Sequence, residues 1–294
     1  MMQLGWARTL LSIAAMGALV TISAAMARPD TPPETLVPTS PWNMDYAVES
    51  CRLMRAFGPV GSPVLFKLEK FSLTDRPSLM VVGKRFSSDS PFQRVRVGFG
   101  DAPVAELHAL AGSMGDEHTP MLIIPAVDLV PRPSAVFIVP PDPVAERRVG
   151  TMMIQRVGSK AVALQLGPMD KPMEAMRSCI DSLVKSWGLD PVVQRSLTRQ
   201  AIPLASPATW VVDNDYPSKA AAAGENGLVH FRLLIDDGGK PSRCVIQSKT
   251  KPDDFAPTVC AAIMRRARFQ PALDAQAKPV PSYFASSVRF QFGY

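Results

Sequence analysis

The sequence predicts an α+β protein: a β-rich N-terminal domain closed by one helix, then a small C-terminal domain in the order helix, β-hairpin, helix, β-strand. Three observations support this fold class. Short apolar runs separated by Gly and Pro fill residues 42–189, one helical stripe ends that region, and helical and period-two patterns alternate over 214–294. The 294 residues are 47% hydrophobic and 20% charged, a composition that suits two globular domains.

The first 27 residues have the three parts of a secretory signal peptide. Arg8 carries the only charge, an apolar run covers 10–22, and an Ala-Met-Ala sequence ends at Ala27. We therefore predict export, with cleavage between Ala27 and Arg28. The alternative is a retained membrane anchor, because the apolar run and the small residues after it come close to the roughly 20 residues that span a bilayer.

Charge and cysteine content exclude several classes of function. The net charge of +6 is spread along the chain without a long run of Lys or Arg, which argues against nucleic acid as a partner. Zinc sites need cysteines about two to four residues apart, and no pair has that spacing, so we predict no metal and no cofactor. In an exported protein an even set of cysteines favours disulfides. The set is Cys51, Cys179, Cys244 and Cys260.

The N-terminal domain is predicted from strand patterns. Residues 28–41 are a Pro-rich lead-in whose composition resists regular structure. The β-rich domain of unknown function follows at 42–189, where apolar and polar residues alternate over 64–69 and 94–99. Further strand candidates are the apolar runs at 79–82, 121–125, 135–139 and 161–166.

One helix closes this domain, and a linker follows it. The spacing predicts the helix over 171–187, with Gly188 where a C-cap belongs. Its apolar stripe is typical of core packing and consists of Met173, Met176, Ile180, Leu183, Val184 and Trp187. Residues 190–213 mix polar residues with prolines and lack sustained periodicity, so we predict an interdomain linker there.

The C-terminal domain begins with a short alanine-rich helix that has Pro217 in its first turn. Period-two alternation then predicts a strand up to Ile235, and Asp237-Gly238-Gly239 supplies the residues of a tight hairpin turn before the returning strand at 241–248. Four-residue spacing predicts a helix over 255–268. Alternation predicts the final strand at 283–292.

This order, together with several spaced motifs, resembles the TonB C-terminal domain family. The motifs are Tyr216-Pro217, the Gly227 strand with its Asp-Gly-Gly turn, the run Arg-Arg-Ala-Arg-Phe-Gln-Pro-Ala at 265–272, Lys278-Pro279-Val280 and Val288-Arg289-Phe290. The resemblance covers about residues 214–294, a little over a quarter of the chain. It implies a periplasmic energy-transducer-like protein that takes part in transmembrane transport and grips a short strand of an outer-membrane receptor.

In this family, binding occurs by β-strand addition to an open sheet edge. The resemblance implies that the last strand is this edge, and that Tyr216 and Pro217 lie close to the receptor. The alternative for Tyr216 is simple packing under the first helix, and for the strand it is cover by its own domain or by dimer exchange. The predicted peptide-binding residues are Tyr283, Phe284, Ala285, Ser287, Arg289 and Gln291.

The family fold also implies a disulfide, because Cys244 in the second strand and Cys260 in the helix would face each other. The alternative is two buried free thiols. By elimination we expect Cys51 to pair with Cys179, which would tie the closing helix to the β-rich domain.

Two features depart from the family pattern. A leader that looks cleavable replaces the membrane anchor, and a globular domain replaces the long stalk. Contact with the motor proteins ExbB and ExbD would therefore require a retained N-terminus, in a chain anchored in the inner membrane and facing the periplasm. Otherwise the protein is periplasmic and binds a TonB-dependent receptor or another periplasmic protein without transducing energy.

The second function we consider is an exported structural or envelope-interaction protein that uses the terminal module for self-association, as in a homodimer. An enzymatic function is not predicted, and no catalytic residue is assigned. The carboxylates Asp45, Glu49 and Asp75 have no identifiable partner set, and the sequence has no G-x-S-x-G segment.

Overall fold

The computed structural model describes residues 32–131, 141–250 and 253–291. The signal peptide with its predicted cleavage site at Ala27 and Arg28, the strand candidate at 135–139 and the last residues of the predicted final strand lie outside these ranges. From Pro33 onward the chain forms one compact unit. We call residues 34–187 the large-sheet region and residues 212–291 the C-terminal region.

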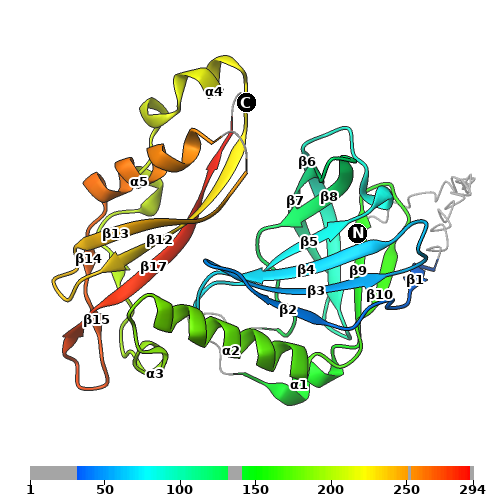
Figure 1. The fold of residues 1–294 in the computed structure, drawn as a ribbon, viewed down its shortest axis with the longest axis horizontal. Coiled ribbons are helices and arrows are strands. Elements are labelled where there is room, and N and C mark those ends of the chain that lie inside the picture. Colours follow the sequence, from blue (N-terminus) through cyan, green and yellow to red (C-terminus); the bar gives the residue numbers. More distant parts are fainter. Residues whose placement is uncertain (1–31, 132–140, 251–252, 292–294) are drawn as a thin grey trace, which may run out of the picture. The chain divides into compact units, whose positions relative to one another are not determined.

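A single curled sheet forms most of the large-sheet region (Figure 1). Its strand order is β1-β10-β9-β6-β7-β8-β5-β4-β3-β2, and every pairing is antiparallel except that of β1 with β10. The strands are β1 (Glu34–Leu36), β2 (Asn43–Tyr46), β3 (Cys51–Phe57), β4 (Val64–Lys70), β5 (Ser78–Val82), β6 (Phe92–Phe99), β7 (Ala105–Met114), β8 (Thr119–Ile124), β9 (Thr151–Arg156) and β10 (Val162–Gln165).

The Pro-rich segment joins the β1 end of this sheet to β3, the strand that neighbours β2 at the other end. β1 pairs with β10, and the residues after β1 then hydrogen-bond to the end of β3: Gly58 N–H donates to Val37 O and Thr39 N–H donates to Ala56 O, both at 2.9 Å. Backbone groups that would otherwise need water are thus paired. The lead-in that the composition predicts to lack regular structure therefore contains a short strand.

The helix α2 (Asp170–Ser186) covers one face of the sheet, as its spacing predicts. Its buried residues Met176, Ile180 and Val184 belong to the same core as the inward side chains of the strands. The Cys51–Cys179 disulfide bonds this helix to β3 across a sequence separation of 128. By the loop-entropy estimate such a closure contributes about 5 kcal/mol to stability. The shorter elements here are the 3-10 helix η1 (Lys84–Phe86) and α1 (Pro143–Arg148).

A three-stranded sheet in the order β13-β12-β17 forms the C-terminal region, with one helix packed on it. Val229, Phe231, Leu233 and Ile235 point from β12 into a core shared with that helix. The Cys244–Cys260 disulfide links β13 to the helix and contributes about 3 kcal/mol by the same estimate. The elements are α4 (Ser218–Ala222), β12 (Gly227–Ile235), β13 (Pro241–Lys249), α5 (Phe255–Arg266), β14 (Phe269–Gln270), β15 (Ala272–Leu273), β16 (Pro279–Val280) and β17 (Ser282–Phe290).

Residues 190–213, the predicted linker, contain short elements that pack on the C-terminal region. β11 (Ile202–Pro203) pairs with β14, and Thr198 N–H donates to Leu273 O at 2.9 Å. The other elements between the two regions are α3 (Pro191–Arg195) and η2 (Pro207–Thr209), and η3 (Asp213–Asp215) lies at the start of the C-terminal region. Whether this segment separates two independently folding domains stays a prediction.

Candidate peptide-binding edge and the seam beside it

The edge of the C-terminal sheet at β17 is the candidate binding site. Among the described residues, β17 pairs with β12 and with no other strand. On the far side of β12, Thr250 N–H donates to Leu228 O and Leu228 N–H donates to Thr250 Oγ1, both at 2.9 Å, so the Leu228 peptide groups face β13. In an antiparallel pair, opposed residues either both point their peptide groups toward each other or both point them away. Arg289, which is paired with Leu228, therefore points its N–H and C=O away from β12. The outward-facing set on β17 is Arg289, Ser287, Ala285 and Tyr283.

The later half of this edge is accessible. Ser286, Ser287 and Arg289 are exposed, and Ala285 is half-buried. Gln291 follows the strand, which ends at Phe290. Peptide groups of Ala285, Ser287 and Arg289 can therefore accept an added strand by main-chain hydrogen bonds.

The early half of the edge is occupied by contacts. Tyr283 is 4% exposed, and its hydroxyl accepts a hydrogen bond from Leu73 N–H at 3.1 Å. Burial raises the pKa of Tyr283 to about 12. Phe284 points to the opposite face and packs against Trp210 and Phe269 in the C-terminal core. The side chains of these two predicted binding residues therefore pack inside the protein.

Tyr216 lies at one end of β17, on the face that α5 covers. Its ring contacts Phe255 and Phe290 edge to face, with centroids 5.5 and 5.3 Å away. Its hydroxyl donates to Glu225 O, and burial raises its pKa. Pro217 precedes α4. These contacts with α5 and β17 hold the strand end in place, whereas the alternative considered for Tyr216 is packing under the first helix.

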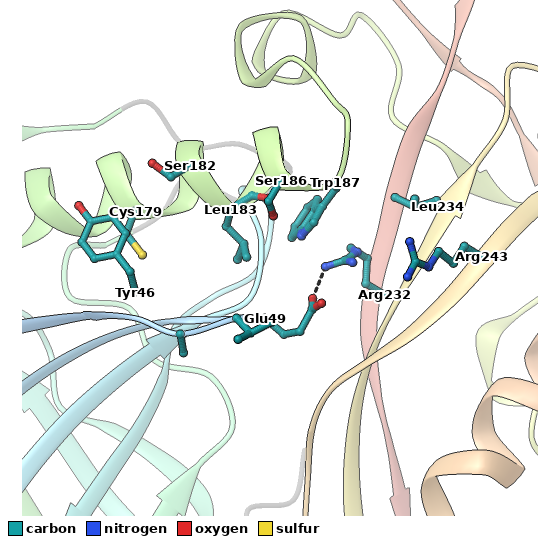
Figure 2. Close-up of a pocket in the computed structure, with 12 residues that line it drawn as sticks. Tyr46, Glu49, Cys179, Ser182, Leu183, Ser186, Trp187, Arg232, Leu234 and Arg243 are labelled. Atoms are coloured by element: carbon teal, nitrogen blue, oxygen red, sulfur yellow. Dashed lines mark hydrogen bonds and ion pairs between the residues drawn. The ribbon is translucent and has the colours of Figure 1, made fainter.

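The other face of the C-terminal sheet packs on the large-sheet region through a polar seam (Figure 2). Arg232 of β12 donates to Glu49 Oε2 at 2.5 Å, and its guanidinium carbon lies 4.1 Å from the centre of the Trp187 ring. The Arg232 side chain is only 4% exposed, and burial lowers its pKa while Glu49 opposes that shift. A buried cation of this kind needs its partner.

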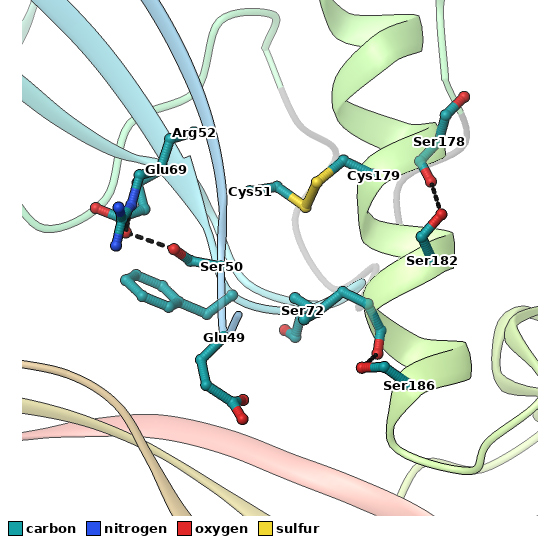
Figure 3. Close-up of a disulfide and its surroundings, with 12 residues drawn as sticks. Glu49, Ser50, Cys51, Arg52, Glu69, Ser72, Ser178, Cys179, Ser182 and Ser186 are labelled. Carbon is teal, nitrogen blue, oxygen red and sulfur yellow. Dashed lines mark hydrogen bonds and ion pairs between the residues drawn. A yellow bond between two sulfur atoms is a disulfide. The ribbon is translucent and has the colours of Figure 1, made fainter. Parts of the chain in front are cut away.

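Glu49 is held where β3 begins. Figure 3 shows the Cys51–Cys179 disulfide between β3 and α2, with Glu49 on the same stretch of chain. Trp187 directly follows the last residue of α2. The disulfide therefore fixes together the two segments that supply the partners of Arg232.

Two further side chains contribute to the seam. The His230 ring stacks on Phe71 with centroids 4.5 Å apart, and burial lowers the pKa of this imidazole. Gln247, at a β-bulge of β13, donates from Nε2 to Phe71 O at 2.9 Å and to Glu49 O at 3.2 Å. Bulges commonly redirect a side chain in this way.

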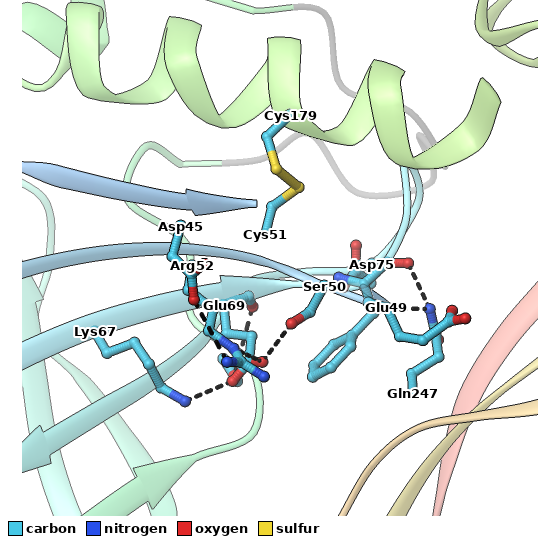
Figure 4. Close-up of polar contacts among 12 residues, drawn as sticks. Asp45, Glu49, Ser50, Cys51, Arg52, Lys67, Glu69, Asp75, Cys179 and Gln247 are labelled. Carbon is cyan, nitrogen blue, oxygen red and sulfur yellow. Dashed lines mark hydrogen bonds and ion pairs between the residues drawn. A yellow bond between two sulfur atoms is a disulfide. The ribbon is translucent and has the colours of Figure 1, made fainter. Parts of the chain in front are cut away.

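A buried carboxylate near the seam is fully paired (Figure 4). Glu69 accepts from Ser50, Arg52 and Lys67 at 2.7, 2.9 and 2.6 Å. Burial alone would raise the pKa of Glu69, but these neighbours hold it below its usual range. An ionised, fully bonded carboxylate is suited to fixing structure, not to donating a proton.

The seam residues were missed by sequence reasoning. The sequence shows that His230 and Arg232 alternate with the apolar residues of their strand, which is equally typical of a solvent-facing side. No pattern in the sequence indicates that another part of the chain covers this side. Within the described ranges, no cluster of His, Cys, Asp and Glu could hold a metal ion.

The described residues of the two regions line several cavities, three of which bear on the site. Cavities of about 510 and about 550 Å³ flank the seam: Arg232 and Trp187 line the first, and His230 and Met80 line the second. The third, of about 360 Å³, lies against the open half of β17. All three are wide enough for side chains of a partner chain.

Comparison with known proteins identifies the C-terminal region. Residues 212–292 match the family model described as the Gram-negative bacterial TonB protein C-terminal, a non-enzymatic transducer and interaction domain that is periplasmic in general. No curated protein matches the chain. Within the described residues, no helix has the length and apolar character needed to cross a membrane. Residues 212–292 are therefore a TonB C-terminal domain, which confirms the resemblance seen in the sequence.

Proposed function

We propose that this is a periplasmic TonB-like protein that binds an extended peptide of a TonB-dependent outer-membrane receptor, or of another periplasmic protein, by strand addition to β17. The observation that carries the proposal is the open edge of a TonB C-terminal domain, at which Ala285, Ser287 and Arg289 direct their peptide groups outward. Edge strands with unpaired peptide groups are templates for such pairing.

The test uses the full exported chain and synthetic N-terminal peptides of outer-membrane receptors, with affinity measured by calorimetry. Ser287→Pro removes an outward N–H, and proline is tolerated on an edge strand when that N–H faces solvent. We expect this variant to keep its circular dichroism spectrum and to lose about tenfold or more in affinity, a change of about 1.4 kcal/mol. Ser287→Ala, which keeps the N–H, should bind like the wild type.

A matched variant checks the assigned direction of the edge. Ser286 pairs with Phe231 of β12, and its N–H faces that strand. Ser286→Pro should therefore lower the free energy of unfolding, because it removes a ladder hydrogen bond. Equal binding by Ser287→Pro and the wild type would contradict strand addition.

Self-association is the second candidate, because the same open edge can pair with β17 of a second copy. Sedimentation equilibrium distinguishes the two. A dimer that Ser287→Pro dissociates, together with no binding of any receptor peptide, would support the self-association function.

Energy coupling forms a separate part of the proposal and depends on the N-terminus. A mature protein that begins at Arg28 by intact-mass analysis would exclude contact with an inner-membrane motor. A chain that keeps Met1 and stays in the membrane fraction would support the transducer function.

A further inference from the structure

The cavity of about 360 Å³ beside β17 has walls from both regions of the chain. Ala285 and Ser287 line it from the β17 side, and Pro125 and Ala126, which follow β8, line it from the large-sheet side. Pro125 is exposed and Ala126 is half-buried, so the cavity opens to the surface beside the accessible half of the edge.

The direction of side chains on β17 determines what an added strand would place there. Ser287 pairs with His230, which stacks on Phe71, and Ala285 packs against the core of the large-sheet region. Both side chains therefore face that region. Directly opposed residues of neighbouring strands point to the same face of a sheet. The residues of an added strand that lie opposite these two must point toward the cavity as well.

The charges around the cavity already have partners. Asp75 accepts from Phe71 N–H at 2.7 Å and lies 3.3 Å from Lys70 Nζ, and Arg76 forms a bidentate pair with Asp128. A charged side chain entering here would lose water without gaining a counter-ion. The Pro125, Ala126 and Ala285 side chains offer apolar contact instead.

We propose, on the basis of the proposed function, that the large-sheet region forms half of the peptide site, and that this cavity receives one aliphatic side chain of the added strand. Pro125 and Ala126 would then select among partners that all pair with β17 through their main chain. The large-sheet region would thus determine specificity in addition to supporting the C-terminal sheet.

The test is an array of the receptor N-terminal peptides in which each position in turn is replaced by Gly, Leu, Lys or Asp. The array is probed with the full chain and with its Ala126→Trp and Ala126→Asp variants. We expect one peptide position at which Leu binds at least about tenfold better than Gly or Asp, a difference of about 1.4 kcal/mol, because the cavity would remove its apolar surface from water. Ala126→Trp should remove this preference, and Ala126→Asp should change it to Lys.

Val60→Trp is the control for Ala126→Trp, because Val60 is 95% exposed and does not line the cavity. A gain of Lys binding by Ala126→Asp cannot result from misfolding, so it keeps the test decisive if the Trp variant is unstable. Two results together would overturn this inference and leave the proposed function standing. Ser287→Pro would weaken peptide binding, and no peptide position would change its preferred residue when residue 126 is changed. Absence of binding by every peptide would instead overturn the proposed function.

Discussion

Arg232 and Glu49 are 183 residues apart in sequence, yet the guanidinium of one donates to the carboxylate of the other at 2.5 Å. The ring of Trp187 covers the same guanidinium. One cation of the TonB-like sheet is thereby held by two residues of the large-sheet region. The face of β12 that alternation predicts to be polar is consequently an internal contact of the protein.

Glu49→Ala should destabilise the protein by about 3 kcal/mol, because it leaves Arg232 buried without a counter-ion. Urea unfolding followed by tryptophan fluorescence measures the change. Glu106→Ala is the matched control. Its pair with Arg94 has side chains that are 58% and 64% exposed, and exposed pairs contribute about 0–1 kcal/mol. Similar losses in the two variants would contradict a structural role for the buried pair.

Tyr283→Phe should change the response of stability to alkaline pH. The folded-state pKa of about 12 lies above the ordinary value of 10, so above pH 10 the unfolded chain loses the phenol proton first. Stability is therefore complete below pH 10 and falls as pH rises toward 12, by about 2 kcal/mol at pH 11.5. Tyr283→Phe removes this fall, and it costs about 1 kcal/mol at neutral pH because Leu73 N–H loses its acceptor. If the free energy of unfolding of both proteins fell equally between pH 10 and 11.5, Tyr283 would not be the source of the fall.

His230 should make the protein less stable in mild acid. Burial, the largest influence, lowers its folded-state pKa below the ordinary 6.5, although Asp75 and Glu69 oppose that shift and Lys67 adds to it. As pH falls below 6.5 the unfolded chain takes up a proton first, so stability is present above that pH and declines below it. Unfolding of the wild type and His230→Phe at pH 7.5 and 5.5 tests this, with exposed His118→Phe as control. A decline of the same size in all three proteins would exclude His230 as its source.

Gly239→Ala should destabilise the β12–β13 hairpin. Gly239 has a φ of +80°, and a Cβ there would lie 2.1 Å from Phe269 O. The left-handed conformation alone costs a non-glycine residue about 1–2 kcal/mol, and the collision would add to this cost. Gly238→Ala is the matched control, since its nearest contact is 3.4 Å away in the same turn. Thermal melting that ranks Gly238→Ala as the less stable protein would contradict this turn geometry.

Local sequence patterns were sufficient to predict most helices and strands of the C-terminal region. The turn at Asp237-Gly238-Gly239 and the alternation before it specify the hairpin, and four-residue spacing specifies α5. The predicted helix extends to Arg268, whereas α5 ends at Arg266. The chain becomes extended at Ala267, and Phe269 and Gln270 then pair with β11. That pairing is a tertiary contact, and helical periodicity carries no information about it.

Other parts of the fold depend on contacts between distant residues. β7 was not predicted, because most of its side chains are exposed or half-buried and show no clean alternation; its pairing with β6 and β8 makes it a strand. β1 lies in a Pro-rich segment and exists through its parallel pairing with β10. For the candidate site, alternation along β17 separates Ala285, Ser287 and Arg289 from the inward Phe284, and their role in binding stays a prediction. The sequence cannot predict that Tyr283 is covered by Leu73, since their contact spans 210 residues.

The disulfide between β3 and α2 also has a mechanical consequence. Under tension applied to the two ends of the chain, the force would pass from Cys51 to Cys179 through the sulfur atoms and bypass the residues between them. At about 3.5 Å per residue, a separation of 128 amounts to roughly 450 Å of chain that cannot be drawn out while the bond is intact. Strands β3 to β10 lie inside this loop and would not be extended, so the load would fall on the residues before Cys51 and on the C-terminal part of the chain after Cys179.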